Sequence, residues 1–178
     1  MSLTDRFQLS AIDLETTGLA VAQARIVQIG IVRADEKGIE LDSWSAYVGP
    51  KTVALLPGFV CRRSDQLLAS SFSEVADEAL SRLSATTIIA HNAAFDMHVL
   101  LSEFARAGRA WRPGPVRCTL MLARAHLPGR RSYRLADLAQ ELGLPAATHD
   151  ALDDARCALA LYRAITALAE RRTAAGSE

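Results

Sequence analysis

Cysteine and lysine are both scarce in this chain of 178 residues. The three cysteines, Cys61, Cys118 and Cys157, are odd in number and show no C-x-x-C spacing. This pattern argues against a disulfide framework and a zinc site, and it fits a reducing compartment, so we expect a cytoplasmic protein. Lysine occurs only at Lys37 and Lys51. Nearly all of the basic residues are therefore arginines, which we attribute to codon usage and not to a need for guanidinium chemistry.

The chain also lacks long apolar runs and a surplus of either charge. No window approaches 18 uninterrupted apolar residues, and the first ten residues lack the basic and apolar regions of a secretory signal. Twenty basic and 20 acidic residues give a formal net charge of zero, so the net charge gives no reason to expect strong attraction to a polyanion or a membrane. We therefore expect one soluble globular domain over residues 1–178, without a membrane partner.

Strand patterns come first, and helical patterns alternate with strands later in the chain. Strands are predicted at 7–13, 24–33, 39–48, 86–90 and 116–119, the first three as an antiparallel meander. Helices are predicted from the N-cap Ser73 to 83, from the N-cap Asn92 to Gly108, and at 119–126, 134–142 and 150–170. The expected fold class is α/β, a sandwich with a mixed sheet, with an ordered core over about residues 7–170 and a frayed tail at 171–178.

The stretch IDLETTGL at residues 12–19 places two acids at the end of an apolar strand. Residues two apart in a strand point the same way, so Asp13 and Glu15 share a face with Leu9 and Ala11, and they lie about 7 Å apart. Taken alone, such a pair would be interpreted as a solvated strand end.

A third carboxylate interrupts an apolar stripe on the last predicted helix. Steps of three and four residues connect Ala151, Asp154, Ala158, Leu161, Ile165 and Leu168. Burying an ionised acid costs several kcal/mol unless it is paired or bound to a cation, so Asp154 needs a partner near the sheet. Asp150 lies one turn earlier on nearly the same face, whereas Asp153 is rotated by about 100° and is interpreted as solvated.

Asp96 is a fourth candidate, in the first turn of the helix that follows the buried strand at 86–90. The helix dipole also favours an acid at this position, which is the alternative explanation. In a sandwich, a strand end and the starts of two helices can meet at one edge of the sheet. We therefore expect Asp13, Glu15, Asp96 and Asp154 to cluster.

Four clustered carboxylates would raise one another's pKa values unless cations neutralised them. Their combined charge of about −4 matches two Mg²⁺ or Mn²⁺ ions, which prefer oxygen ligands, and such a pair suits phosphodiester hydrolysis. Zinc is disfavoured because the chain offers no cysteine or multiple-histidine ligand set. His149, five residues before Asp154, could accept a proton from the attacking water, and an exposed capping histidine is the alternative.

Together these motifs resemble the DnaQ-like, or DEDDh, family of 3′→5′ exonucleases, which includes the proofreading epsilon subunit of bacterial DNA polymerase III. DLETTGL resembles the first motif, AHNAAFD (90–96) the second, and His149 with Asp154 the third, over about residues 7–168. The resemblance implies a ribonuclease-H-like three-layer fold with a five-stranded mixed central sheet flanked by helices. It also implies the site: metal ligands at Asp13, Glu15, Asp96 and Asp154, a general base at His149, a terminal-nucleotide pocket at Thr16, Thr17 and Leu19, and contacts to the penultimate nucleotide from Asn92 and Phe95.

Some features compete with this pattern or depart from it. Tyr133 and Asp137 match the YxxxD motif of a sister class, but they fall in an amphipathic helix pattern, so the histidine class is favoured. Gln28 stands where the family commonly has glutamate, and the segment 58–71 lacks a Gly-Ile-Thr stretch often found there, which leaves strand preference open. No long extension follows Glu170, so a stand-alone nuclease and a subunit associated with a DNA polymerase both fit.

Eight arginines and no acid occur between residues 104 and 136. If this segment flanks the site, Arg130 and Arg131 could contact the backbone of a single strand and make binding sensitive to salt. A solvated surface in an arginine-rich protein is the alternative.

The sequence thus predicts a metal-dependent 3′→5′ exonuclease that uses two Mg²⁺ or Mn²⁺ ions. It would release nucleoside 5′-monophosphates from single-stranded or frayed 3′ ends of DNA. An RNA exonuclease of the ribonuclease T or oligoribonuclease kind is the alternative within the same class. A non-catalytic nucleic-acid-binding relative is the alternative from another class, and the five filled catalytic positions argue against it.

Overall fold

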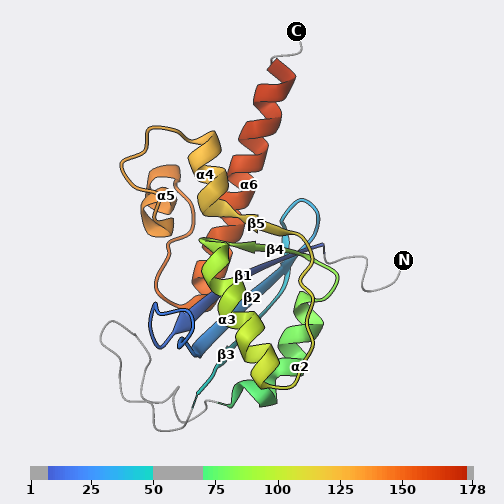
Figure 1. The fold of residues 1–178 in the computed structure, drawn as a ribbon. Coiled ribbons are helices and arrows are strands. Elements are labelled where there is room, and N and C mark those ends of the chain that lie inside the picture. Colours follow the sequence, from blue (N-terminus) through green and yellow to red (C-terminus); the bar gives the residue numbers. More distant parts are fainter. Residues whose placement is uncertain (1–7, 50–69, 176–178) are drawn as a thin grey trace.

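The computed structural model describes residues 8–49 and 70–175, whose strands form a five-stranded sheet in the order β3-β2-β1-β4-β5 (Figure 1). The strands are β1 (Leu9–Thr16), β2 (Ile26–Ala34), β3 (Glu40–Tyr47), β4 (Thr87–Ala90) and β5 (Val116–Cys118). β1, β2 and β3 are antiparallel neighbours, whereas β4 runs parallel to both β1 and β5. The predicted mixed sheet of five strands is therefore confirmed.

Helices cover both faces of this sheet (Figure 1). On one face lie α2 (Phe72–Leu83) and α3 (Ala93–Arg106), where Phe104 packs in one cluster with Ile31 of β2. On the other face lies α6 (Ala151–Ala175), where Leu159 packs in one cluster with Ala11 of β1. The shorter helices α4 (Thr119–His126) and α5 (Leu135–Leu142) pack against α6 in a third cluster around Leu138. This arrangement is the three-layer, ribonuclease-H-like fold that the sequence predicted.

Alternation along β1 assigns its side chains to the two faces. Leu9 and Ala11 lie in the cluster beneath α6, whereas Ile12 and Leu14 lie in the cluster beneath α2 and α3. β4 pairs with β1 only between Leu9 and Ala11, so the second half of β1 extends past β4. Ligand sites in α/β sheets form beyond the carboxyl ends of parallel strands, and the end of β1 occupies such a place.

Helix ends differ from the sequence prediction at three points. α2 begins after Ser71 and not after Ser73, because a capping box forms at Ser71. Asn92 directly precedes α3 but makes no side-chain capping hydrogen bond, and its backbone is left-handed with φ +61°. α6 continues to Ala175, past the predicted end at residue 170, so part of the segment expected to fray is helical.

Within the two described ranges, no helix combines the length and the apolar character that a membrane span requires. Among the described residues, Cys118 and Cys157 are free thiols. Cys61 and nearly all of the segment 58–71, on which strand preference was left open, lie outside the described residues.

Candidate active site

Four carboxylates converge between the end of β1 and the starts of α3 and α6. Asp13 and Glu15 come from β1, Asp96 from the first turn of α3, and Asp154 from the first turn of α6. Asp96 is 4% exposed and Asp154 8%, while Asp13 and Glu15 are partly buried. The charge of each of the other three acts on Asp13. The structure thus brings together acids that are up to 141 positions apart, from residue 13 to residue 154.

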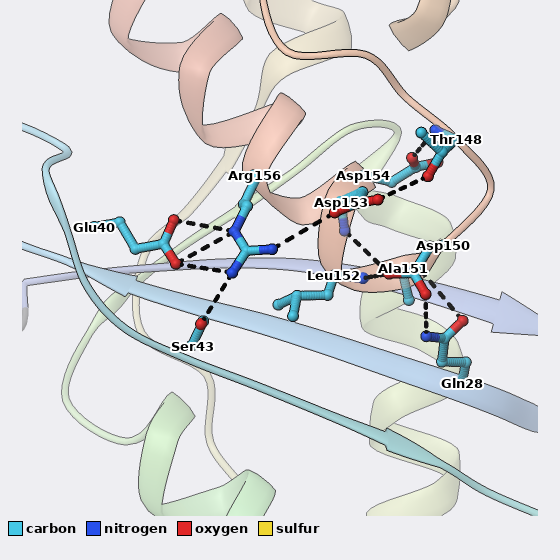
Figure 2. A network of polar contacts seen from close by, with 10 residues as sticks. All are labelled: Gln28, Glu40, Ser43, Thr148, Asp150, Ala151, Leu152, Asp153, Asp154 and Arg156. Atoms are coloured by element: carbon cyan, nitrogen blue, oxygen red, sulfur yellow. Dashed lines mark hydrogen bonds and ion pairs between the residues drawn. The ribbon is translucent and has the colours of Figure 1, made fainter. Parts of the chain in front are cut away.

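A histidine ring lies against the same group. His149 lies two residues before the start of α6 and is exposed. Its ligand nitrogen and carboxylate oxygens of Glu15 and Asp154 all lie within 4.8 Å of one another. The His149 backbone is left-handed, with φ +61°, a conformation that residues with a Cβ rarely adopt. One oxygen of Asp154 accepts a hydrogen bond from the backbone N–H of Thr148 at 2.7 Å, which orients this carboxylate (Figure 2).

Asp153 has a structural contact that the sequence analysis missed. It was interpreted as solvated, but its Oδ2 accepts a hydrogen bond from the Thr148 hydroxyl at 3.0 Å, and its other oxygen pairs with Arg156 at 3.5 Å. Arg156 also binds Glu40 of β3 (Figure 2). The spacing of three residues between Asp153 and Arg156 was the available signal, because such a pair is adjacent on a helix. These contacts connect the turn before α6 to the sheet.

Gly30 allows α6 to begin directly above the carboxylates. In the β1–β2 register Gly30 is the partner of Asp13. A Cβ added at Gly30 would lie 2.3 Å from the backbone C and O atoms of Ala151 and 2.5 Å from the backbone N of Leu152. Backbone atoms cannot move aside as a flexible side chain can, so the close approach of α6 requires glycine here.

Gly30→Ala is expected to destabilise the protein by about 1–3 kcal/mol, because the added methyl group overlaps the backbone of α6. For a chain of this size, each kcal/mol lowers Tm by about 2–4 °C, which thermal unfolding in EDTA will measure. Gly18→Ala is the matched control, since a Cβ at Gly18 meets nothing within 4 Å. Equal Tm values for the two variants would contradict the tight packing of α6 on β2.

Burial is the largest cause of a raised pKa in all four carboxylates. It raises the pKa of Asp96 to about 8 and that of Glu15 to about 7. The pKa of Asp13 also lies well above its usual value, because repulsion from Asp96 and Asp154 adds to burial. The pKa of Asp154 is raised as well, although the hydrogen bond from Thr148 opposes the shift. The site therefore holds protons near neutral pH unless cations replace them.

Within residues 8–49 and 70–175, no ion pair joins any of the four acids to arginine or lysine. The charge of His149 opposes the rise in pKa of Glu15 and Asp154 but does not cancel it. By contrast, the buried carboxylate of Glu103 pairs with both Arg25 and Arg106. Buried carboxylates without a basic partner are the oxygen ligands that hard divalent cations prefer. The four acids therefore fit a site for hard divalent cations.

The last residue of β1 and the exposed residues that follow it form a border next to the carboxylates. The Thr16 hydroxyl donates to the carbonyl of Gly18 at 3.0 Å, and the Thr17 hydroxyl accepts the backbone N–H of Arg25 at 3.1 Å. The backbone N–H of Thr17 donates in turn to the carbonyl of Arg25 at 2.9 Å. These bonds fix the segment while the side chain of Leu19, which is 86% exposed, stays free to contact a ligand.

The other predicted contact residues lie around the start of α3. Asn92 is exposed, and Phe95 is half-buried and packs against the core. The two ring nitrogens of His91 lie 2.9 Å from the Thr119 hydroxyl and 2.9 Å from the carbonyl oxygen of Tyr133. Both nitrogens of His91 are thus occupied by protein atoms, which agrees with a structural role for this residue.

Tyr133 and Asp137 do not join the carboxylate group. The Tyr133 hydroxyl donates to the carbonyl of Leu127 at 2.9 Å, and Asp137 is exposed in the first turn of α5. Among the described residues, neither acts on the pKa of any of the four clustered acids. The geometry therefore favours His149 over the YxxxD match.

Part of the arginine-rich segment is neutralised within the protein. Arg109 pairs with Asp77 of α2, and Arg130 pairs with Glu141 of α5. Arg131 is exposed, and no ion pair of Arg131 occurs in the described part of the chain. Of the two arginines that the sequence singled out, Arg131 is the better placed to meet a polyanion.

Known exonucleases are similar to this chain in sequence. Residues 10–162 match the exonuclease family RNase_T. The DNA polymerase III subunit epsilon of Treponema pallidum is 34% identical over 165 residues, which cover 89% of this chain and 76% of that protein. The 3′-5′ exonuclease DinG of Staphylococcus saprophyticus is 31% identical over 140 residues, which cover 76% of this chain and only 15% of that protein.

Solved structures share the fold. Escherichia coli exonuclease I in complex with a dT13 oligonucleotide matches with a TM-score of 0.78 at 20% identity, over 93% of this chain and 42% of that chain. Exonuclease I from Methylocaldum szegediense matches with a TM-score of 0.74 at 23% identity, over 89% of this chain and 40% of that chain. This chain thus spans less than half the length of exonuclease I. Since the family match and the epsilon relative extend over most of the sequence, the chain belongs to the DnaQ-like family of 3′→5′ exonucleases.

Proposed function

We propose that this exonuclease removes single nucleotides from single-stranded or frayed 3′ ends of DNA and releases nucleoside 5′-monophosphates, with two Mg²⁺ or Mn²⁺ ions as cofactors. One observation carries the proposal. Four carboxylates with raised pKa values, and with no arginine or lysine partner in the described chain, lie beside the exposed imidazole of His149. A buried negative cluster next to a base is suited to hydrolysis of a phosphodiester with the help of cations.

Each residue of the site has a distinct role in this reaction. Asp13, Glu15, Asp96 and Asp154 hold the cations through their carboxylate oxygens. When bound, the cations supply Lewis-acid stabilisation of the charge that develops on the phosphate and favour deprotonation of the attacking water. His149 accepts the water proton while the oxygen forms a bond to the terminal phosphorus and the bond from phosphorus to the 3′ oxygen breaks. An imidazole is suited to this transfer near neutral pH.

The border of the site is proposed to hold the end of the strand. Thr16, Thr17 and Leu19 line the place of the terminal nucleotide, with the exposed side chain of Leu19 against its base. Asn92 and Phe95, at the start of α3, contact the penultimate nucleotide. The hydrogen bonds that fix the 16–18 segment reduce the ordering needed on binding, which favours affinity.

DNA is the favoured substrate because the similar proteins act with DNA or bind it. The epsilon relative is a subunit of a DNA polymerase, and exonuclease I binds deoxyribonucleotide oligomers in its solved complexes. RNA is the alternative, because nearly all of the segment 58–71, on which strand preference was left open, lies outside the described residues. Association with a DNA polymerase is a further proposal suggested by the epsilon relative, which co-purification would test.

Digestion of 5′-labelled oligonucleotides tests the proposed function. We expect Mg²⁺ or Mn²⁺ to give a ladder that shortens from the 3′ end, faster for single-stranded than for duplex DNA, and EDTA to stop it. Faster digestion of RNA would select the alternative substrate. Binding without hydrolysis under either metal would instead indicate the non-catalytic alternative.

Arg131→Ala is expected to weaken binding of single-stranded DNA and to reduce the salt slope by about 0.7, the value for one lost phosphate contact. Fluorescence anisotropy of a labelled oligonucleotide at 50–200 mM salt measures both quantities. Arg171→Ala, which removes an exposed arginine near the far end of α6, is the control. If both variants kept the slope of the unmodified protein, Arg131 would not contact the backbone.

A further inference from the structure

Gln28 is a buried amide that connects β2 to the start of α6. Its side chain is 3% exposed, and in the β1–β2 register Gln28 is the partner of Glu15. The amide nitrogen donates a hydrogen bond to Oδ2 of Asp150 at 2.8 Å, and the amide oxygen accepts the backbone N–H of Ala151 at 3.3 Å (Figure 2). Both ends of the amide are therefore used at the same turn.

Asp150 is fully engaged as the cap of α6. Its Oδ1 accepts the backbone N–H groups of Leu152 at 2.9 Å and Asp153 at 3.2 Å, while its Oδ2 accepts the amide of Gln28 (Figure 2). Its carbonyl also accepts the N–H of Asp154 at 2.9 Å. Asp150 thus acts on the backbone at the start of α6, although it lies near the metal-site carboxylates.

These hydrogen bonds anchor both neighbours of His149 in the chain. On one side of His149, Thr148 is bound to Asp153 and Asp154, and on the other side Asp150 is bound to Gln28. His149 itself has a left-handed backbone, which costs energy for a residue with a Cβ and persists only where the surroundings impose it. The position of the imidazole therefore depends on both anchors.

The chemistry at residue 28 matters as much as its size. An amide can donate to the Asp150 carboxylate and accept from the Ala151 N–H at the same time. A glutamate at residue 28 could accept from the Ala151 N–H but would place a second carboxylate against Asp150. Gln28 and Asp150 are thus a matched pair of donor and acceptor in this chain.

We infer that Gln28 is a positioning residue for catalysis: by holding Asp150 and the first turn of α6, it places the imidazole of His149 against Glu15 and Asp154. The inference rests on the proposed role of His149 as the proton acceptor. It assigns no contact with substrate or cation to Gln28.

Reversal of the donor and the acceptor tests the pairing of Gln28 with Asp150. Gln28→Glu is expected to lower kcat on single-stranded DNA at least about tenfold, with KM and the Kd for Mn²⁺ changed less than about twofold, because it moves the base and not the substrate border. The double variant Gln28→Glu with Asp150→Asn restores a donor facing an acceptor, keeps an N-cap and keeps the net charge. It should recover kcat to within about threefold of the unmodified protein, whereas Asp150→Asn alone should not.

A cycle with His149→Ala separates positioning from a general structural effect. If Gln28 acts through His149, Gln28→Glu should change kcat by less than about twofold once His149 is alanine. A full tenfold loss in that background, or a double variant no better than Gln28→Glu alone, would overturn the inference. Gln28→Met, which removes both hydrogen bonds without adding charge, replaces Gln28→Glu in the cycle if the latter is unfolded by circular dichroism.

The same mutant cycle separates the proposed role of His149 as the proton acceptor from the positioning role of Gln28. Full activity in His149→Ala would show that the proposed role of His149 is wrong. A loss in His149→Ala together with normal kcat in both Gln28 variants would refute the positioning role alone.

Discussion

Asp13→Asn is expected to lower kcat at least about 10³-fold and, in EDTA, to raise Tm by at least about 3 °C. Activity falls because the variant removes a charged ligand from the centre of the proposed cation site. Stability rises because burial and repulsion from Asp96 and Asp154 penalise the ionised Asp13, and an uncharged amide avoids that penalty. Digestion of a labelled oligonucleotide gives kcat, and thermal unfolding in EDTA gives Tm.

Glu170→Gln is the matched control, because this acid is exposed near the far end of α6. Glu170→Gln should leave kcat and the Tm in EDTA unchanged. Asp13→Asn that retained a tenth of the activity would show that Asp13 is not a central ligand. A lower Tm in EDTA would show that the carboxylate stabilises the metal-free fold, contrary to the raised pKa.

The stabilisation by Mn²⁺ is expected to be larger at pH 8 than at pH 6, by several degrees in Tm. Folding raises the pKa of Glu15 from 4.5 to about 7 and that of Asp96 from 3.8 to about 8. The protonated forms of both acids therefore stabilise the folded state. Their contribution to the free energy of unfolding is complete below about pH 4 and is lost as the pH rises through 7 to 8. Cations restore the lost stability because they bind the ionised carboxylates, and thus they act most where these groups have lost their protons.

Calorimetry provides a second readout of the same linkage. At pH 7, Mn²⁺ binding should release about one proton or more, seen as a binding enthalpy that depends on the ionisation enthalpy of the buffer. The Asp13→Asn chain should show weaker stabilisation by Mn²⁺ at either pH. An enthalpy identical in phosphate-free buffers of high and low ionisation enthalpy would contradict the protonated state of the metal-free site.

Local and periodic patterns account for what the sequence predicted well. Alternation along β1 put Asp13 and Glu15 on the α6 side, and the three- and four-residue steps of the last helix put Asp154 toward the sheet, where the structure has them. The order of the motifs gave the fold through family resemblance. The place of Asp96 in the cluster could be predicted only with the whole fold, because the clustered acids come from two helices and a strand.

Contacts between distant segments account for what the sequence did not reveal. The need for glycine at Gly30 arises from Ala151, and the neutralisation of Arg130 arises from Glu141, which only tertiary structure brings near. The start of α2 was misplaced by two residues because Ser71 and Ser73 are both suitable caps by type, and the reciprocal bonds with Glu74 select Ser71. No propensity rule distinguishes such competitors without their neighbours.

Anomalous diffraction from crystals soaked with Mn²⁺ and thymidine 5′-monophosphate tests the central claim most directly. We expect two anomalous peaks about 3.5–4 Å apart, with oxygens of Asp13, Glu15, Asp96 and Asp154 at coordination distance. Peaks that lay elsewhere on the protein, or no ordered Mn²⁺ beside these four carboxylates, would contradict it.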